Sequence, residues 1–178
     1  MIAARFVKRR TLFMTLWYTS NLVVHLIAIA LWLGGIVFFL VVVGPAVHEL
    51  EPRIAVTSMN QARLGLETMS WIAIALILMT GVFNLVTKSQ IDPTTLSGVY
   101  LYTLGAKMLL FVAMVVHHCL QVFKYGPRIA RLTNQSPPAP ATWPEPLLSN
   151  WQRWFLLLKL NAALGPIVVL LGLALVKN

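Results

Sequence analysis

The sequence has few charged residues, few acidic ones and almost no cysteine. Charged residues make up 11 % of its 178 positions, with five Asp and Glu against fourteen Lys and Arg. A soluble domain carries roughly 25 % charged residues, so this composition argues against a water-soluble globule, a disordered chain or a coiled coil. The single cysteine, Cys119, excludes an internal disulfide bond.

Motifs of soluble catalysis are also missing. The sequence has no Ser-His-Asp arrangement, no glycine-rich phosphate loop and no zinc-ligand spacing. The formal net charge of +9 would suggest nucleic acid as the partner of a soluble protein. Here the basic residues mostly flank apolar runs, so we expect membrane lipids with anionic headgroups as partners, and no nucleic acid.

Long apolar runs dominate the chain instead. Hydrophobic residues make up 58 % of it, and the mean hydropathy is +0.78. Four runs reach the ~20 residues that a helix needs to cross a bilayer, and backbone groups in lipid must be paired within their own segment. The sequence therefore predicts an all-α integral membrane four-helix bundle, one transmembrane domain over 1–178, with helices at about 22–47, 66–87, 99–122 and 154–176.

The connections and ends add detail to this arrangement. The basic N-terminus resembles a signal peptide, but the apolar part is too long, so we interpret it as an uncleaved first span. A proline-rich loop is predicted at about 125–153, and a short turn with Asp92-Pro93 joins the second and third helices. Aromatic residues before the first and fourth spans predict interfacial anchors: Trp17, Tyr18, Trp151 and Trp154.

Topology rests on the basic residues between the spans. The positive-inside count ties at about six on each side, and only the cluster in the first ten residues favours a cytoplasmic N-terminus. We expect a multi-pass protein of a bacterial inner (cytoplasmic) membrane. The membrane face where the first span begins is named the near face, and the opposite one the far face.

Polar side chains inside the spans are the main functional signal, because they are costly in hydrocarbon. Counting along the antiparallel helices places His25, Asn84 and Lys107 within about two turns of the near face, where they could meet. The same count brings His117, His118 and Asn161 to one level near the far face, with His48 at the rim. The sequence thus predicts two polar layers.

Neutral imidazole is a common ligand of haem iron and of copper. His25 and His117 differ in depth by roughly twelve residues, about 18 Å, so they should not bind one iron from opposite sides. A haem near the near face would use His25, with Lys107 as second ligand or as the partner of a propionate. A haem near the far face would use His117 or His118, with His48 or an external ligand. The alternative for His25 is a purely structural bond to a neighbouring carbonyl group.

Helical spacing indicates which side chains face the bundle interior. Lys107 and His118 lie eleven residues apart, close to three full turns, and share a face with Met114. In the first span, one stripe carries His25 and Trp32 and continues to Gly35 and Phe39. The glycines at positions 34 and 35 predict close approach of a neighbouring helix or of a flat ligand.

Several short motifs resemble known families. The run His25-Leu-Ile-Ala-Ile-Ala-Leu-Trp32-Leu-Gly34-Gly35 is similar to the first span of the copper-resistance D (CopD) family. Leu78-Met79-Thr80-Gly81 resembles its Thr-Gly element, and Lys107 resembles its lysine. The haem-dependent protoporphyrinogen oxidase (HemJ) family shows a similar pattern, matched here by six residues: His25, Trp32, Lys107, His117, His118 and Asn161.

The resemblance implies a four-helix scaffold and a haem held by those six residues. The apolar stretch 36–44 and Ala162 after Asn161 depart from the oxidase pattern, which argues against that oxidation as the activity. The favoured hypothesis is a membrane protein that binds haem b and takes part in electron transfer, alone or as a small subunit of a respiratory or other redox complex. If it is an enzyme, we expect a haem-dependent membrane oxidoreductase.

Two other hypotheses remain open. In the first, the chain is a copper-transport or copper-resistance protein of the CopD type, using soft and imidazole ligands: Met79, Met108, Met114, His117, His118 and Cys119. In the second, it is a non-catalytic accessory subunit that packs against other membrane protein subunits. Candidate metal ligands across these hypotheses are His25, His48, His117 and His118.

Overall fold

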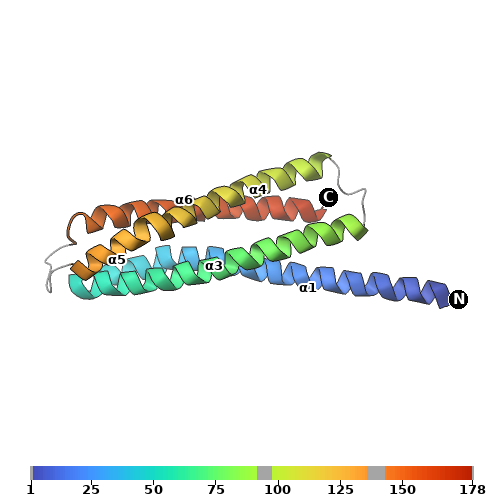
Figure 1. Ribbon diagram of the computed structural model, residues 1–178, viewed down its shortest axis with the longest axis horizontal. Coiled ribbons are helices and arrows are strands. Elements are labelled where there is room, and N and C mark those ends of the chain that lie inside the picture. Colours follow the sequence, from blue (N-terminus) through green and yellow to red (C-terminus); the bar gives the residue numbers. More distant parts are fainter. Residues whose placement is uncertain (1, 92–97, 136–142, 178) are drawn as a thin grey trace.

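Long helices make up the described structure, a computed structural model of residues 2–91, 98–135 and 143–177, with side chains described for 15–90, 98–135 and 143–175. These ranges contain no strand. Figure 1 shows the arrangement. The helical elements are α1 (Ile2–Phe38), the π-helical η1 (Phe39–Val43), α2 (Gly44–His48), α3 (Pro52–Ile91), α4 (Gly98–Cys119), the π-helical η3 (Leu120–Tyr125), α5 (Gly126–Gln135) and α6 (Leu147–Lys177).

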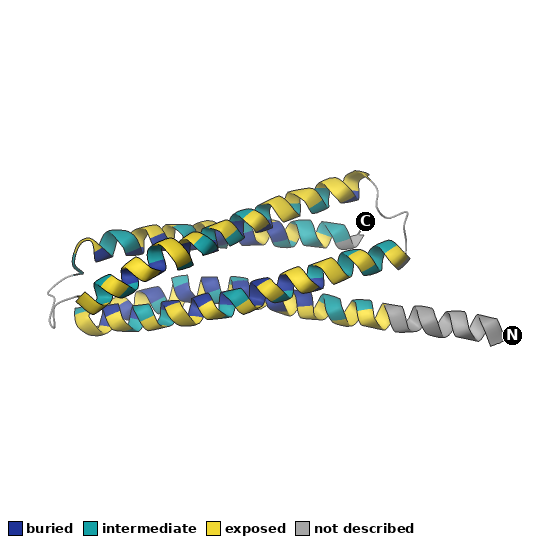
Figure 2. Cartoon of the chain, in the orientation of Figure 1, coloured by how far each residue is buried: buried dark blue, intermediate teal, exposed yellow. Residues whose placement is uncertain are grey.

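The prediction of an all-α membrane four-helix bundle is confirmed. In the part of the chain that the structure describes, four segments are long and apolar enough to cross a membrane: Thr15–His48, Pro52–Gln90, Gly98–Gln135 and Leu147–Leu175. In Figure 2, exposed residues cover the outer faces of the helices, and buried residues lie where helices meet. Most of the exposed large side chains are aliphatic, as expected for a surface that faces lipid.

The helices are longer than the apolar runs that predicted them. Helix α1 already begins at Ile2, and α3 at Pro52. The predicted loop at 125–153 is wrong at both ends, because Gly126–Gln135 forms α5 and α6 begins at Leu147. Helix α5 is amphipathic, with Ile129 fully buried against the core, so it remains helical without a continuous apolar run. The prolines at 137–140 and Asp92-Pro93 lie outside the described residues.

Two antiparallel helix pairs form the bundle. One pair joins α1 to α3, and the other joins α4 to α6 (Figure 1). Contact between the pairs runs mainly from α1 to α6 and from α3 to α5. Since α5 lies at the far-face end, its contact with α3 joins the two pairs there.

Each π-helical stretch ends at a Gly-Pro dipeptide. Segment η1 is followed by Gly44-Pro45, and η3 by Gly126-Pro127. Proline has no N–H to donate, and its ring clashes with the carbonyl group four residues earlier. A local widening to π geometry relieves that clash and keeps the helix continuous.

The interior stripe of the first span is confirmed. His25, Trp32 and Phe39 are all buried. Gly35 packs against α3 so closely that a Cβ built on it would lie 2.1 Å from Met69 Cε. The prediction of close approach is wrong for Gly34, where the same construction meets nothing within 4 Å.

Tryptophan placement differs from prediction at the far face. Trp151 and Trp154 are only 2 % and 1 % exposed, so they are core residues rather than lipid-facing anchors. Their ring centroids lie 5.5 Å apart, and Trp154 also packs at 5.2 Å against Phe39. Trp17 is 54 % exposed, as an anchor in the headgroup region would be.

Candidate functional site

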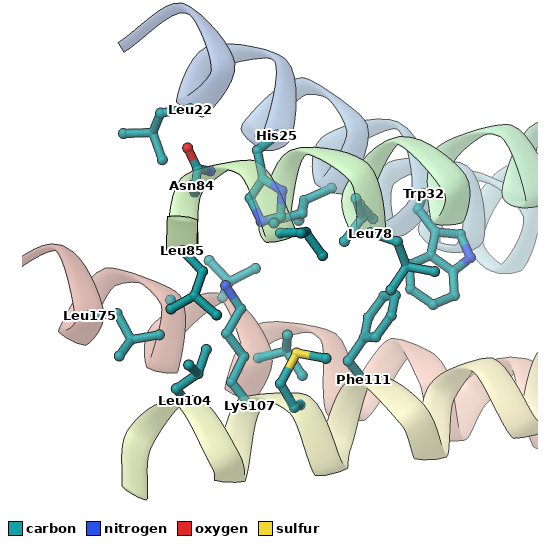
Figure 3. A pocket seen from close by; sticks show the side chains of 18 of the residues that line it. Leu22, His25, Trp32, Leu78, Asn84, Leu85, Leu104, Lys107, Phe111 and Leu175 are labelled. Carbon is teal, nitrogen blue, oxygen red and sulfur yellow. The ribbon is translucent and has the colours of Figure 1, made fainter. Parts of the chain in front are cut away.

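A cavity of about 240 Å³ lies between the two helix pairs, in the half of the bundle towards the near face. Its walls come from α1, α3, α4 and α6 and are mostly apolar (Figure 3). Trp32 and Phe111 meet edge to face at the deep end, with ring centroids 5.9 Å apart. The site is therefore an apolar chamber within the membrane-spanning part of the molecule.

His25 is held against one wall by a defined hydrogen bond. Its Nδ1 lies 2.7 Å from Thr80 Oγ1. The Thr80 hydroxyl donates its own hydrogen to the backbone carbonyl oxygen of Leu76, at 2.5 Å. A hydroxyl has one hydrogen to donate, so Thr80 accepts the bond from Nδ1–H of His25. This arrangement leaves the lone pair on Nε2, and the ring extends into the cavity (Figure 3).

Lys107 enters the same cavity from the opposite pair. It rises from α4 into the space between the helices (Figure 3). Within the described ranges, no acceptor or carboxylate contacts its Nζ. A Cβ built on Gly172 would lie 3.1 Å from this Nζ, so the glycine in α6 gives the amine its room. Among the described residues, this cation in the cavity therefore has no partner.

A set of hydrogen bonds closes the near-face end of the cavity. Asn21 Nδ2 donates to Asn84 Oδ1 at 2.8 Å. Lys88 Nζ donates to the carbonyl oxygen of Leu175 at 2.9 Å and lies 4.5 Å from the centre of the Tyr100 ring. These contacts link α1 to α3, and α3 to both α4 and α6.

The predicted near-face layer is confirmed, because His25, Asn84 and Lys107 all line this one cavity. Trp32 lines it as well. These candidate residues thus come together between the helix pairs, whereas the remaining histidines and Asn161 do not line the cavity.

In the far half, His117 and Asn161 meet as their levels predicted. His117 Nδ1 lies 3.0 Å from Asn161 Oδ1, and Asn161 Nδ2 donates to the carbonyl oxygen of Met114 at 3.1 Å. Both bonds join α4 to α6. These two polar side chains therefore satisfy each other and strengthen one helix pair.

The other two histidines lie apart from each other. His118 is 4 % exposed and packs edge-on against Trp71, with ring centroids 5.1 Å apart. His48 is exposed and lines a separate open groove with Lys159. No described contact joins His48 to His117 or His118. The side chains that the structure describes contain no group of three or more His, Cys, Asp or Glu placed to hold a metal ion.

Sequence reasoning missed a buried ion pair in the far half. Arg63 Nη1 lies 2.7 Å from Glu67 Oε1, and the Arg63 side chain is only 2 % exposed. Asn60 accepts further bonds from the guanidinium group, and Trp154 Nε1 donates to Glu67 at 3.3 Å. The available signal is the spacing of Arg63 and Glu67, four residues apart on one helix face. It is easily overlooked because the second apolar run begins only at Leu66.

The cavity can be tested against the demands of a haem. An iron porphyrin needs a nitrogen lone pair, a flat apolar slot and partners for its two carboxylates. His25 Nε2 can supply the nitrogen lone pair, the space between the helix pairs is apolar, and Lys107 can pair with one of the carboxylates. At about 240 Å³ the enclosed space is below the roughly 300–1,000 Å³ of typical ligand sites, so it would enclose only part of a haem.

No family model, curated protein or solved structure matches this chain.

Proposed function

We propose that this membrane protein binds haem b in the cavity between its helix pairs and takes part in electron transfer. The observation that carries the proposal is the state of His25. Its Nδ1–H is donated to Thr80, and its Nε2 lone pair is presented to an apolar cavity. Metal-binding histidines commonly donate their second ring N–H in this way, which fixes the tautomer and the ring orientation.

The residues around the cavity have distinct roles in this proposal. His25 would supply a nitrogen ligand to the iron, and Thr80 would position it. Lys107 would supply either a second ligand or the positive charge that pairs with a propionate, since both need an amine facing the cavity. Trp32 and Phe111 form the apolar wall that keeps water out. The bound haem would supply reversible one-electron chemistry.

The proposal also includes a cellular setting for this chemistry. Membrane lipids are the direct surroundings of the outer faces, and a bacterial inner membrane is the setting we propose. The chain would exchange electrons as a small subunit of a respiratory or other redox complex, with other membrane protein subunits as partners. The resemblance to the CopD and HemJ families supports a haem site at His25, Trp32 and Lys107.

Copper transport is supported less well by the geometry. Met79 is 71 % exposed on the outer face, whereas Met114 is buried in the interior. His117 is engaged by Asn161. The soft and imidazole ligands therefore lie on different sides of the helices instead of forming one path.

Absorption spectroscopy tests the proposal. We expect the protein purified from haem-replete cells to show a Soret band and to change on reduction. His25→Ala should remove or strongly shift that band, while the protein remains helical and monodisperse. A colourless wild-type preparation from such cells would contradict haem binding and would favour the accessory-subunit hypothesis.

A further inference from the structure

We infer that the cavity exchanges its occupant sideways with the lipid phase, through a portal between α3 and α4 formed by Leu78, Val82 and Met108. The inference rests on the proposed function for the identity of the occupant, but not for the route. The class of ligand follows from the route: a molecule that is dissolved in the bilayer rather than one delivered from water.

Exposure of the lining residues locates the portal. Among the described residues that line the cavity, three have exposed side chains, and all the others are buried or half-buried. Leu78 is 43 % exposed, Val82 62 % and Met108 44 %. The first two lie on α3 and the third on α4. Between these two helices, therefore, side chains that line the cavity are also exposed on the outside of the molecule.

The other sides of the cavity are closed by contacts. Asn21 and His25 bond across from α1 to α3. On the seam between α1 and α6, Gly165 packs so tightly that a Cβ built on it would lie 2.5 Å from Leu33 Cδ2. Every lining residue along that seam is buried or half-buried.

Both ends of the cavity are closed as well. Lys88 and Tyr100 form the near-face end, where Lys88 also bonds the last turn of α6. The edge-to-face pair of Trp32 and Phe111 forms the deep end. A polar ligand arriving from water would have to break the near-face contacts, whereas an apolar ligand in the membrane would only displace aliphatic side chains at the portal.

The chemistry of the chamber agrees with this route. Its walls are apolar, and the polar groups that extend into it include the Nε2 lone pair of His25 and the amine of Lys107. A suitable occupant has a wide apolar body that crosses the portal and a polar or anionic edge that reaches these two groups. The open seam also gives room for the part of a ring that a cavity of about 240 Å³ cannot enclose.

The first test measures haem transfer between vesicles. Apoprotein in one set of phospholipid vesicles is mixed with haem in another, and growth of the Soret band is followed. Val82→Trp should slow loading at least about tenfold, because the side chain must move before the ligand enters. Val86→Trp is the matched control: Val86 lies one turn away on α3, is 48 % exposed and does not line the cavity. Equal loading rates for both variants and wild type would overturn the portal.

A second test needs no haem. The photoreactive residue p-benzoylphenylalanine replaces Leu104, which lines the cavity from α4. On illumination in vesicles it should cross-link to phospholipid acyl chains, and Val82→Trp should reduce that yield while Val86→Trp should not. Absence of lipid cross-links, or a yield that Val82→Trp leaves unchanged, would overturn the portal. Portal-dependent cross-linking in a protein that never takes up haem would instead contradict the proposed function and retain the route.

Discussion

The two halves of the bundle differ in what their buried polar groups face. In the far half, Arg63 pairs with Glu67, and His117 pairs with Asn161, while His118 Nε2 and Trp151 Nε1 are buried in packed surroundings without a described hydrogen-bond partner. In the near half, His25 Nε2 and Lys107 Nζ face a cavity without a described protein partner. Burying a polar group without a partner is costly. An unpartnered polar group therefore indicates a ligand only where it also faces a cavity, as His25 and Lys107 do in the near half.

The largest effect is expected at the far-face ion pair. Arg63→Leu leaves the Glu67 carboxylate buried without its cation, so we expect a loss of roughly 3–5 kcal/mol in the free energy of unfolding. The double variant Arg63→Leu/Glu67→Leu should lose less, because no charge is then left unpaired. Unfolding in detergent, followed by circular dichroism, checks this. A single variant as stable as wild type would show that the pair is not structural.

The next prediction concerns Thr80 in the near half. Thr80→Val removes the acceptor of His25 Nδ1–H and leaves the ring free to rotate or to change tautomer. We expect haem affinity to fall by about 10–100-fold, as for other groups that orient a metal ligand. Thr80→Ser keeps the hydroxyl and should bind haem nearly as wild type does. Haem titration of the apoprotein measures both, and equal affinity of the Val variant would remove Thr80 from the positioning role.

Two glycine substitutions compare a tightly packed position, Gly126, with an open one, Gly34. A Cβ on Gly126 would lie 2.8 Å from Arg63 Nη1 and 3.2 Å from the carbonyl oxygen of Gln121. Gly126→Ala should therefore cost about 1–3 kcal/mol of stability through overpacking. Gly34→Ala meets nothing within 4 Å and should be neutral or stabilising by up to about 1 kcal/mol, since alanine favours a helix over glycine. Thermal denaturation of the two variants side by side gives the comparison, and equal midpoints would contradict it.

The smallest expected effect distinguishes the two roles of Lys107. If its amine pairs with a propionate, Lys107→Leu should retain the haem with an unchanged spin state and a lower reduction potential, because a positive charge near the oxidised iron is lost. If the amine is the second ligand, the same variant should change from a six-coordinate low-spin to a high-spin spectrum. Electron paramagnetic resonance and a redox titration separate these outcomes, and a variant unchanged in both would exclude contact between Lys107 and the haem.

Sequence patterns predicted the helices and the depth of polar residues well, because both follow from counting along apolar runs. The meeting of His25, Asn84 and Lys107 and the contact of His117 with Asn161 came from that count alone. The limits of the helices could not be found in this way. Arg63 lies in a part of α3 that extends beyond the apolar run, and its burial depends on α5 packing against it.

The cavity itself could not be predicted from the sequence either. It depends on how far the two helix pairs stand apart, which follows from contacts along both halves of the bundle, including Leu33 with Gly165 and Lys88 with Leu175. The tautomer of His25 can be inferred only from the positions of three groups on two helices: the imidazole, the Thr80 hydroxyl and the Leu76 carbonyl. Helical spacing predicts which residues share a level, but it does not predict which of them remain unpaired.

The sharpest test of the near-face site is the haem content per protein of three variants purified in parallel: His25→Ala, His117→Ala and His118→Ala. Only His25→Ala should lose the haem, since among these histidines His25 alone presents a free nitrogen to the cavity. Full haem content in His25→Ala, or loss confined to His117→Ala or His118→Ala, would contradict the near-face site.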